Sequence, residues 1–171
     1  TRPTGGAFLG FGYWKSTKGW ECKPLEDRKK RLYTKCKAVL VRKRTAARPL
    51  SETIRKLNEI IRGWINYYRI GSMKLFIDKF GQWLRHKVRV VIVKQWKKPK
   101  RIYLNLQKLN RMFKCKMTEE DIFKVANSRL GWYRRCAMNV VNFLLSPKVL
   151  AIPNKKRRRP GLIDPLAYYL S

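Results

Sequence analysis

The chain has 171 residues, of which 42 are Lys or Arg and 10 are Asp or Glu, so its formal net charge is +32 at pH 7. This charge would destabilise a compact fold by self-repulsion unless a polyanion such as nucleic acid neutralises it. Hydrophobic residues make up 44% of the chain and aromatic residues 12%, which excludes a disordered basic tail and predicts a buried core.

The first predicted element is a β-hairpin. Bulky and small residues alternate from Ala7 to Trp14, a turn-like run covers residues 15–19, and an extended pattern resumes from Trp20 to Leu25. The chain begins with a threonine inside a Gly- and aromatic-rich stretch, which we interpret as the start of a segment of a longer protein.

The next segment predicts a strongly basic helix. From Glu26 the sequence lacks Gly and Pro for about twenty residues, and Leu32, Cys36 and Val39 follow helical spacing. The run from Thr45 to Pro49 is expected to end this helix.

A second predicted helix begins with Ser51 as its N-cap and carries the clearest apolar stripe of the chain. The stripe consists of Ile54, Leu57, Ile61, Trp64, Ile65 and Tyr68. Arg55, Arg62 and Arg69 are seven residues apart, so they return to nearly the same side of the helix. This basic stripe is either a solvated face or a phosphate-binding face, and the shortage of nearby acids favours phosphate.

A third helix is predicted from Met73 to Lys98, after Gly71 and Ser72. The β-branched run 88–93 also fits a strand by propensity, but no turn separates it from the helical pattern before it. One face is expected to carry Phe76, Phe80, Leu84, Val88, Val91 and Gln95. The other face is expected to carry the basic residues Lys74, Arg85, Arg89 and Lys94, which lead into Lys97, Lys98, Lys100 and Arg101 around Pro99.

After a short Leu-rich stretch, Thr118 is predicted to cap a helix whose third position is Asp121. The adjacent acids 119–121 fit a helix dipole better than a metal site. A further helix is expected within Asn127–Asn142, where Trp132 and Tyr133 serve core packing or base stacking. Its basic residues are Arg129, Arg134 and Arg135.

The tail contains the basic run Lys155, Lys156, Arg157, Arg158 and Arg159. Such a run is either a nuclear localisation signal or a phosphate-binding loop. Because an apolar segment able to dock on the fold follows at once, we favour the loop.

Sites for metals and membranes find little support in the sequence. The four cysteines form no C-x-x-C pair, and His86 is far from all of them, so we expect reduced thiols and neither a metal nor a cofactor. No apolar run approaches the roughly 18 residues of a membrane span. We therefore expect a soluble, cytoplasmic protein with no membrane partner.

Four motifs in order resemble the group II intron-encoded reverse transcriptases, especially the compact bacterial type. They are Phe8-Leu9-Gly10-Phe11, IIRGWINYYRIG at residues 60–71, KQWKKPK at residues 94–100, and ANSRLGWYR at residues 126–134. The first is similar to the primer-grip hairpin of the reverse transcriptase palm. The others are similar to the maturase-specific region, so the resemblance covers nearly the whole chain.

This resemblance implies a mostly α fold in three parts. Residues 1–25 would be the palm-end hairpin, residues 26–101 the thumb or domain X bundle, and residues 102–171 a helical DNA- or RNA-binding extension. It also implies a bacterial ribonucleoprotein that binds group II intron RNA for splicing. With the remaining fingers and palm, the parent would copy RNA into DNA on a DNA target or RNA–DNA duplex.

The sequence also bears on catalysis and on two alternative functions. Polymerisation needs aspartates that hold Mg²⁺ ions, and the Y-A-D-D motif of the family is absent, so we expect no catalytic residue in this chain. A structural RNA-binding protein without a polymerase parent is the alternative. An independent nuclease is disfavoured, because one His and ten scattered acids form no recognisable catalytic group.

Overall fold

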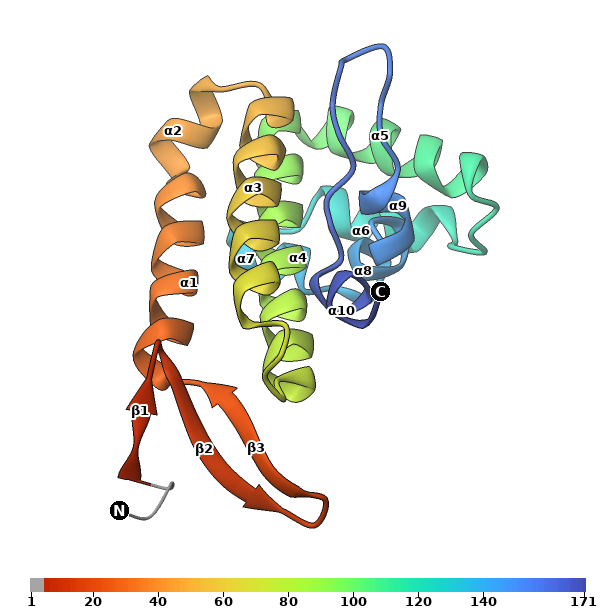
Figure 1. The fold of residues 1–171 in the computed structure, drawn as a ribbon. Helices are drawn as coiled ribbons and strands as arrows, with labels where there is room; N and C mark the ends of the chain where they lie inside the picture. The colour runs from red at the N-terminus through yellow and green to blue at the C-terminus, as the bar shows by residue number, and fades with distance from the viewer. Residues whose placement is uncertain (1–4) are drawn as a thin grey trace.

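The computed structural model describes residues 5–171 and is mostly helical, with a small antiparallel sheet at the N-terminus, as the sequence predicted (Figure 1). The strands are β1 (Ala7–Phe8), β2 (Phe11–Ser16) and β3 (Gly19–Pro24). The helices are α1 (Glu26–Val39), α2 (Arg42–Ala47), α3 (Leu50–Tyr68), α4 (Lys74–Trp96), α5 (Pro99–Met112), α6 (Glu119–Ala126), α7 (Trp132–Cys136), α8 (Asn139–Leu144), α9 (Pro147–Ala151) and α10 (Pro165–Leu170). The predicted domain boundaries stay a prediction, and residues 1–4 of the first part lie outside the described residues.

The predicted hairpin is present as β2 and β3, but the continuous extended stretch from Ala7 to Trp14 is wrong. The chain reverses between β1 and β2, where Leu9 and Gly10 have φ values of 51° and 87°. The three strands therefore lie in the order β1-β2-β3. Glycine suits this turn, since a Cβ at Gly10 would lie 2.8 Å from the Tyr68 hydroxyl.

The first helix ends earlier than predicted. α1 stops at Val39, Val41 occupies the N-cap position of α2, and Thr45 lies inside α2 rather than at a break. The physical reason is packing: this short helix buries Thr45, and the side chain of Gln95 on α4 donates to the Thr45 carbonyl (3.1 Å).

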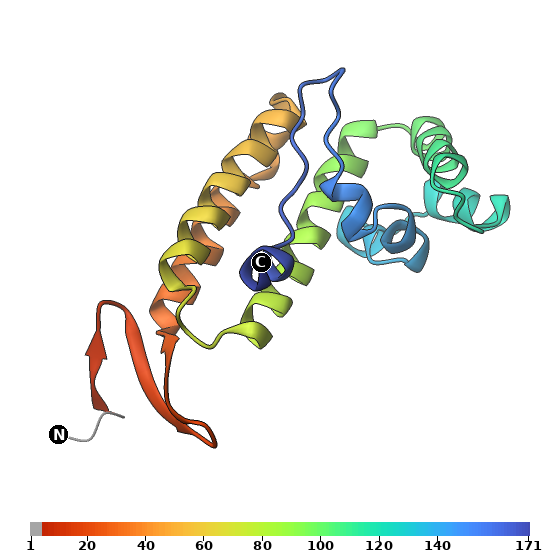
Figure 2. The ribbon, with the colours of Figure 1, turned by 45° about the vertical axis from the view of Figure 1, so that its right-hand side comes forward.

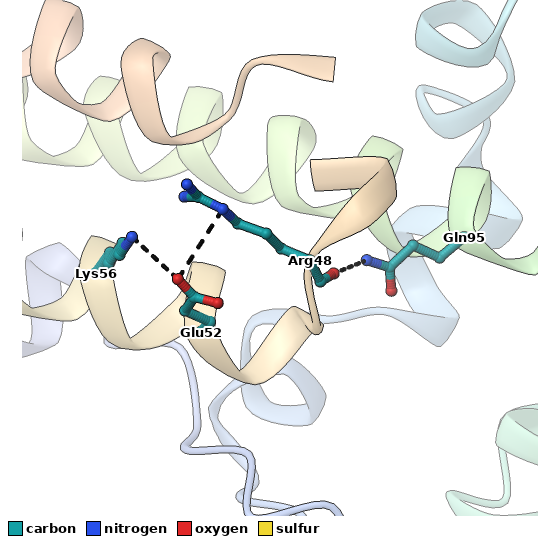
Figure 3. A network of polar contacts seen from close by, with 4 residues as sticks. All are labelled: Arg48, Glu52, Lys56 and Gln95. Atoms are coloured by element: carbon teal, nitrogen blue, oxygen red, sulfur yellow. Dashed lines mark hydrogen bonds and ion pairs between the residues drawn. The ribbon is translucent and has the colours of Figure 1, made fainter. Parts of the chain in front are cut away.

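Ser51 is not an N-cap, because α3 already begins at Leu50 and Pro49 occupies the cap position. Figure 3 shows what holds this end of the helix. Gln95 donates to the Arg48 carbonyl (3.3 Å), and Glu52 pairs with Lys56 (3.1 Å) and with Arg48 (4.0 Å). These cations hold the pKa of Glu52 below its ordinary value, so the carboxylate stays ionised beside the helix N-terminus.

The two long helices form the centre of the fold, as their periodicity predicted. On α3 the predicted apolar stripe is buried, with Trp64 half-buried at its edge. The whole run 88–93 is helical and buried on every side. α4 contacts α2, α5 and α7, and Arg89 within this run bonds to Asn142 and Leu145, so the run loses the one-sided pattern of an exposed helix.

The helix α5 replaces what the sequence suggested was only a Leu-rich stretch. Lys97 has a φ of 61° and ends α4, and Pro99 then stands in the first turn of α5. Proline fits there because the first turn needs no backbone N–H donor. Ile102 and Leu106 are buried one turn apart.

Thr118 caps α6 as predicted: its hydroxyl oxygen accepts from the Asp121 N–H (3.2 Å). The further helix expected within Asn127–Asn142 is present as α7, which carries Trp132 to Arg135, but it is short and is followed by a second short helix, α8. Residues 128–131 lie outside any helix, and the extended Met138 separates α7 from α8. This break lets Cys136, Val141 and Leu144 all reach the core.

Two further features concern the expected reduced thiols and the expected lack of a membrane span. Cys36 and Cys136 are free and buried, and burial raises the pKa of each thiol to about 12. No helix within residues 5–171 combines the length and apolar character needed to cross a membrane. In the same residues, no three His, Cys, Asp or Glu side chains gather where they could hold a metal ion.

Candidate nucleic-acid interface

A basic cleft lies between α3 and the loop that joins α9 to α10. In Figures 1 and 2 this loop runs alongside α3 toward the N-terminal end of that helix. The cleft has a volume of about 390 Å³. Its lining includes the cations Arg55, Arg62, Lys155, Arg158 and Arg159. The fold thus joins two basic groups that the sequence presented separately, the helix stripe and the tail run.

The loop displays its cations on a tight turn. Asn154 and Arg159 face each other in an antiparallel bridge with N–O distances of 2.9 and 3.0 Å. Within it, the Arg158 N–H donates to the Lys155 carbonyl (3.1 Å), and the Asn154 carboxamide oxygen accepts from the Arg157 N–H (3.1 Å). Since these bonds use only backbone groups of the basic run, the side chains of residues 155–158 are exposed.

A buried amide fixes this loop to α3. The Asn58 side chain donates to the Gly161 carbonyl (2.8 Å) and accepts from the Ile163 N–H (3.0 Å). Leu162 between them is only 3% exposed, so the predicted docking of the apolar segment is confirmed. Asn58 is not among the site residues predicted from the sequence. The available signal was its position directly after Leu57, where a polar side chain borders the apolar stripe and needs hydrogen-bond partners if it is buried.

The cleft is strongly cationic, with Glu59 as its one acidic lining residue within the described part of the chain. Arg55, Arg62, Lys155 and Arg158 are exposed, and no ion pair found among residues 5–171 engages them. Arg159 is half-buried, and burial followed by the nearby Arg157 lowers its pKa from the ordinary value. Cations gathered on both walls of a concave surface concentrate a polyanion there.

Two other predicted RNA-binding residues hold the C-terminal segment in place. Arg69, the third member of the α3 stripe, donates to the Tyr168 carbonyl (2.8 Å) and lies over the Tyr168 ring at 5.1 Å. Arg85 pairs with Asp164 at 3.6 Å. Both cations therefore have partners within the protein.

The predicted exposed position of Arg89 is wrong. Arg89 is 8% exposed, and it donates to the Leu145 carbonyl (2.9 Å) and to the Asn142 carboxamide oxygen (2.8 Å). The segment after α7 covers this face of α4, which periodicity within one helix could not reveal. Burial lowers the pKa of Arg89, with a smaller effect of Arg85.

Replacing Arg89 with Met should lower the free energy of unfolding by about 1 to 3 kcal/mol, because the buried Leu145 carbonyl and the half-buried Asn142 side chain lose their donor. Binding to RNA should change no more than for Lys74→Met, which removes an exposed charge from the same helix. Denaturant unfolding and RNA titration of both variants test this. If Arg89→Met left the free energy of unfolding unchanged and greatly weakened RNA binding, this prediction would be contradicted.

Several other predicted cations lie in a second basic region around the C-terminal end of α4. Lys97, Lys98, Lys100 and Arg101 are exposed at the α4–α5 corner, and Lys94 is half-buried. A pocket of about 470 Å³ places Lys94 and Lys97 beside Arg48 and Trp132. Near it, Arg129 and Arg134 are exposed on or before α7, whereas Arg135 lies over the Trp132 ring at 4.9 Å and donates to the Ser128 carbonyl.

The primer-grip-like residues form the turn between β1 and β2 and contact the end of α3. Phe8 and Leu9 are exposed, and the Tyr67 hydroxyl donates to the Leu9 carbonyl (3.1 Å). Phe11 is buried, with its ring centroid 5.0 Å from that of Tyr68. These contacts anchor the sheet to α3. Lys74, another predicted cation, is exposed at the start of α4.

A third hollow, between α1 and α3, is lined by residues that were not predicted as a site. Its volume is about 440 Å³, and Arg28, Arg31 and Lys35 line it from α1. The spacing of three and four residues was the signal available in the sequence, since it places all three on one helix face.

Comparison with known families matches residues 29–113 to the model described as group II intron, maturase-specific domain. The match runs from the first turn of α1 to the residue after α5. It includes the α3 wall of the cleft but not the loop that forms the other wall. A search of curated proteins found no match.

Proposed function

We propose that this chain, whose residues 29–113 match the group II intron maturase-specific domain, binds folded intron RNA. The RNA phosphate backbone would lie in the cleft between α3 and the loop of residues 152–164. The observation that carries this proposal is the meeting of Arg55 and Arg62 with Lys155 and Arg158 in one unpaired basic cleft.

Binding of this kind supports splicing by linkage. A cleft with two cationic walls contacts phosphates from two sides, so it favours RNA whose backbone is already folded to the matching shape. A protein that binds the folded RNA better than the unfolded RNA stabilises the folded state by mass action. The corner cations Lys97, Lys98, Lys100 and Arg101 would extend the contact along the backbone.

The finer role in a reverse transcriptase belongs to the same proposal. The turn at residues 8–11 would hold a primer end, and the helical bundle would clamp an RNA–DNA duplex or DNA target, together with fingers and palm supplied by the parent. The contacts of Tyr67 and Tyr68 with this turn support the proposal, because they hold the turn in a fixed position against α3. Mg²⁺ for DNA synthesis would be held by aspartates outside this chain.

The test removes four charges from the cleft: Arg55→Gln, Arg62→Gln, Lys155→Gln and Arg158→Gln together. Each lost phosphate contact lowers the dependence of log K on log salt by about one, so the slope should fall by roughly three to four. Affinity for group II intron RNA near 100 mM salt should fall by roughly a hundredfold or more. Filter binding across a salt series measures both quantities.

The matched control changes four exposed cations away from the cleft, Lys108, Arg111, Lys114 and Lys116, to Gln, with the same change in net charge. An unrelated structured RNA of equal length provides the specificity control. If both quadruple variants lose the same affinity, net charge alone explains binding and the cleft has no special role.

A further inference from the structure

The hollow between α1 and α3 is lined differently from the basic cleft. From α3 it receives Glu59, Gly63, Trp64, Tyr67 and Tyr68, and from α1 it receives three cations. Glu59 also lines the basic cleft, so the two sites adjoin at this residue. We call the hollow the aromatic groove.

Gly63 opens the aromatic groove at a cost to the helix. It lies in the middle of α3, is exposed, and has nothing within 4 Å of the position a Cβ would take. Glycine inside a helix costs roughly 0.5 to 1 kcal/mol relative to alanine. Packing within this chain does not require the glycine, so the open space itself is the feature that needs an explanation.

The aromatic surface beside Gly63 is already ordered. Trp64 and Tyr68 have ring centroids 4.6 Å apart, and those of Tyr67 and Tyr68 are 4.7 Å apart. Tyr67 is 54% exposed, yet its hydroxyl is held by the Leu9 carbonyl at 3.1 Å. A large exposed ring fixed at its polar end presents a flat face on which a planar ligand can stack at little entropic cost.

Charge within the aromatic groove is divided between its two walls. Arg31 and Lys35 are exposed on α1, while Arg28 already pairs with Asp27 at 3.3 Å. Glu59 is the one acidic lining residue in the described structure, and no ion pair found among residues 5–171 engages it. A phosphate alone would be attracted by the α1 wall and repelled by Glu59. A ligand with a phosphate at one end and hydrogen-bond donors at the other satisfies both walls.

We propose that the aromatic groove binds one unstacked guanine of a single-stranded RNA segment. This inference rests on the proposed function, because it assumes that the chain binds RNA. The base would stack on Tyr67 over the space left by Gly63, with its phosphate near Arg31 and Lys35. Guanine offers two adjacent donors on its Watson–Crick edge, N1–H and N2–H, which match the two oxygens of the Glu59 carboxylate. Adenine offers one donor beside an acceptor.

The experiment compares short single-stranded RNAs that are identical except for one central base: guanine, adenine or inosine, which lacks the N2 amino group. The full 171-residue chain should bind the guanine oligomer roughly tenfold more tightly than the adenine oligomer, with inosine between them, because a bidentate side-chain–base pair discriminates at about this level. Fluorescence anisotropy near 100 mM salt measures the affinities.

Glu59→Gln separates this inference from simple charge. Removing a negative charge should raise the affinity for the adenine oligomer, as it would for any polyanion. For guanine the lost carboxylate opposes that gain, so the preference for guanine over adenine should fall to about one. If Glu59→Gln raises both affinities equally and keeps the preference, Glu59 does not read the base and the proposal is wrong.

Gly63→Leu fills the aromatic groove without removing charge. Leucine is the better helix former, so the variant should unfold at the same or a higher temperature than the native chain. Its preference for guanine should nevertheless be lost, and a retained preference would contradict the proposal. The quadruple cleft variant should weaken both oligomers while keeping their ratio. Binding of both oligomers without preference in the native chain would reject the guanine site alone, whereas no binding of RNA at all would reject the proposed function.

Discussion

Replacing Phe80 with Ala should lower the free energy of unfolding by about 3 to 5 kcal/mol, the largest loss expected from a single truncation in this chain. Phe80 is 0% exposed. Its ring lies 5.2 Å from Tyr33 of α1, 6.3 Å from Phe76 and 5.8 Å from Trp83, measured between centroids. The truncation would leave a cavity where α1 packs on α4, and these aromatic contacts would be lost together.

Thermal and denaturant unfolding measure this loss. For a domain of this size each kcal/mol shifts the melting temperature by about 2 to 4 °C, so a fall of roughly 6 to 20 °C is expected. Phe143→Ala is the matched control, since Phe143 is 60% exposed on α8 and should change stability by only about 0.5 kcal/mol. Equal losses in the two variants would mean that Phe80 is not at the centre of the core.

Replacing Gly161 with Ala should detach the 152–164 loop from α3. A Cβ at this position would collide with the backbone carbonyl of Ala151, which is not a flexible side chain and cannot turn away. To relieve the collision the loop must move, and Asn58 then loses both of its bonds to Gly161 and Ile163. Together with the exposure of Leu162, this should lower stability by about 2 to 4 kcal/mol.

The same variant should weaken RNA binding by roughly tenfold without changing the net charge, because Lys155 and Arg158 leave the cleft. Unfolding and salt-dependent RNA titration test both effects. Gly131→Ala is the control, since Gly131 has nothing within 4 Å of the Cβ position and a φ of −57° that alanine accepts. Full RNA affinity in Gly161→Ala would show that the loop does not contribute to the interface.

The two long helices were predictable because their patterns are local. The stripe from Ile54 to Tyr68 repeats over four turns, so one helix face meets the core whatever the remaining chain does. The cap of α6 was equally predictable, since Thr118 and Asp121 satisfy each other within one turn.

The shorter elements were not predictable in the same way. The separate helix α2 and the break between α7 and α8 exist because Thr45 and Cys136 are buried by segments distant in sequence. Over five or six residues a helical period and an irregular turn give similar patterns, so tertiary contacts decide between them. The missed helix α5 had a local signal in Pro99, which the basic run around it obscured.

For the candidate site, too, local features were predictable and long-range contacts were not. Composition and spacing alone predict a nucleic-acid partner. They also locate the basic stripe with Arg55 and Arg62 and the basic run at residues 155–159, because charge and helical period are properties of the chain itself. Only the tertiary structure decided which cations remain available. It joined that stripe to the loop through Asn58, engaged Arg69 and Arg85 with the C-terminal segment, and buried Arg89, because hydrogen bonds and ion pairs between distant residues form only when the fold brings them together.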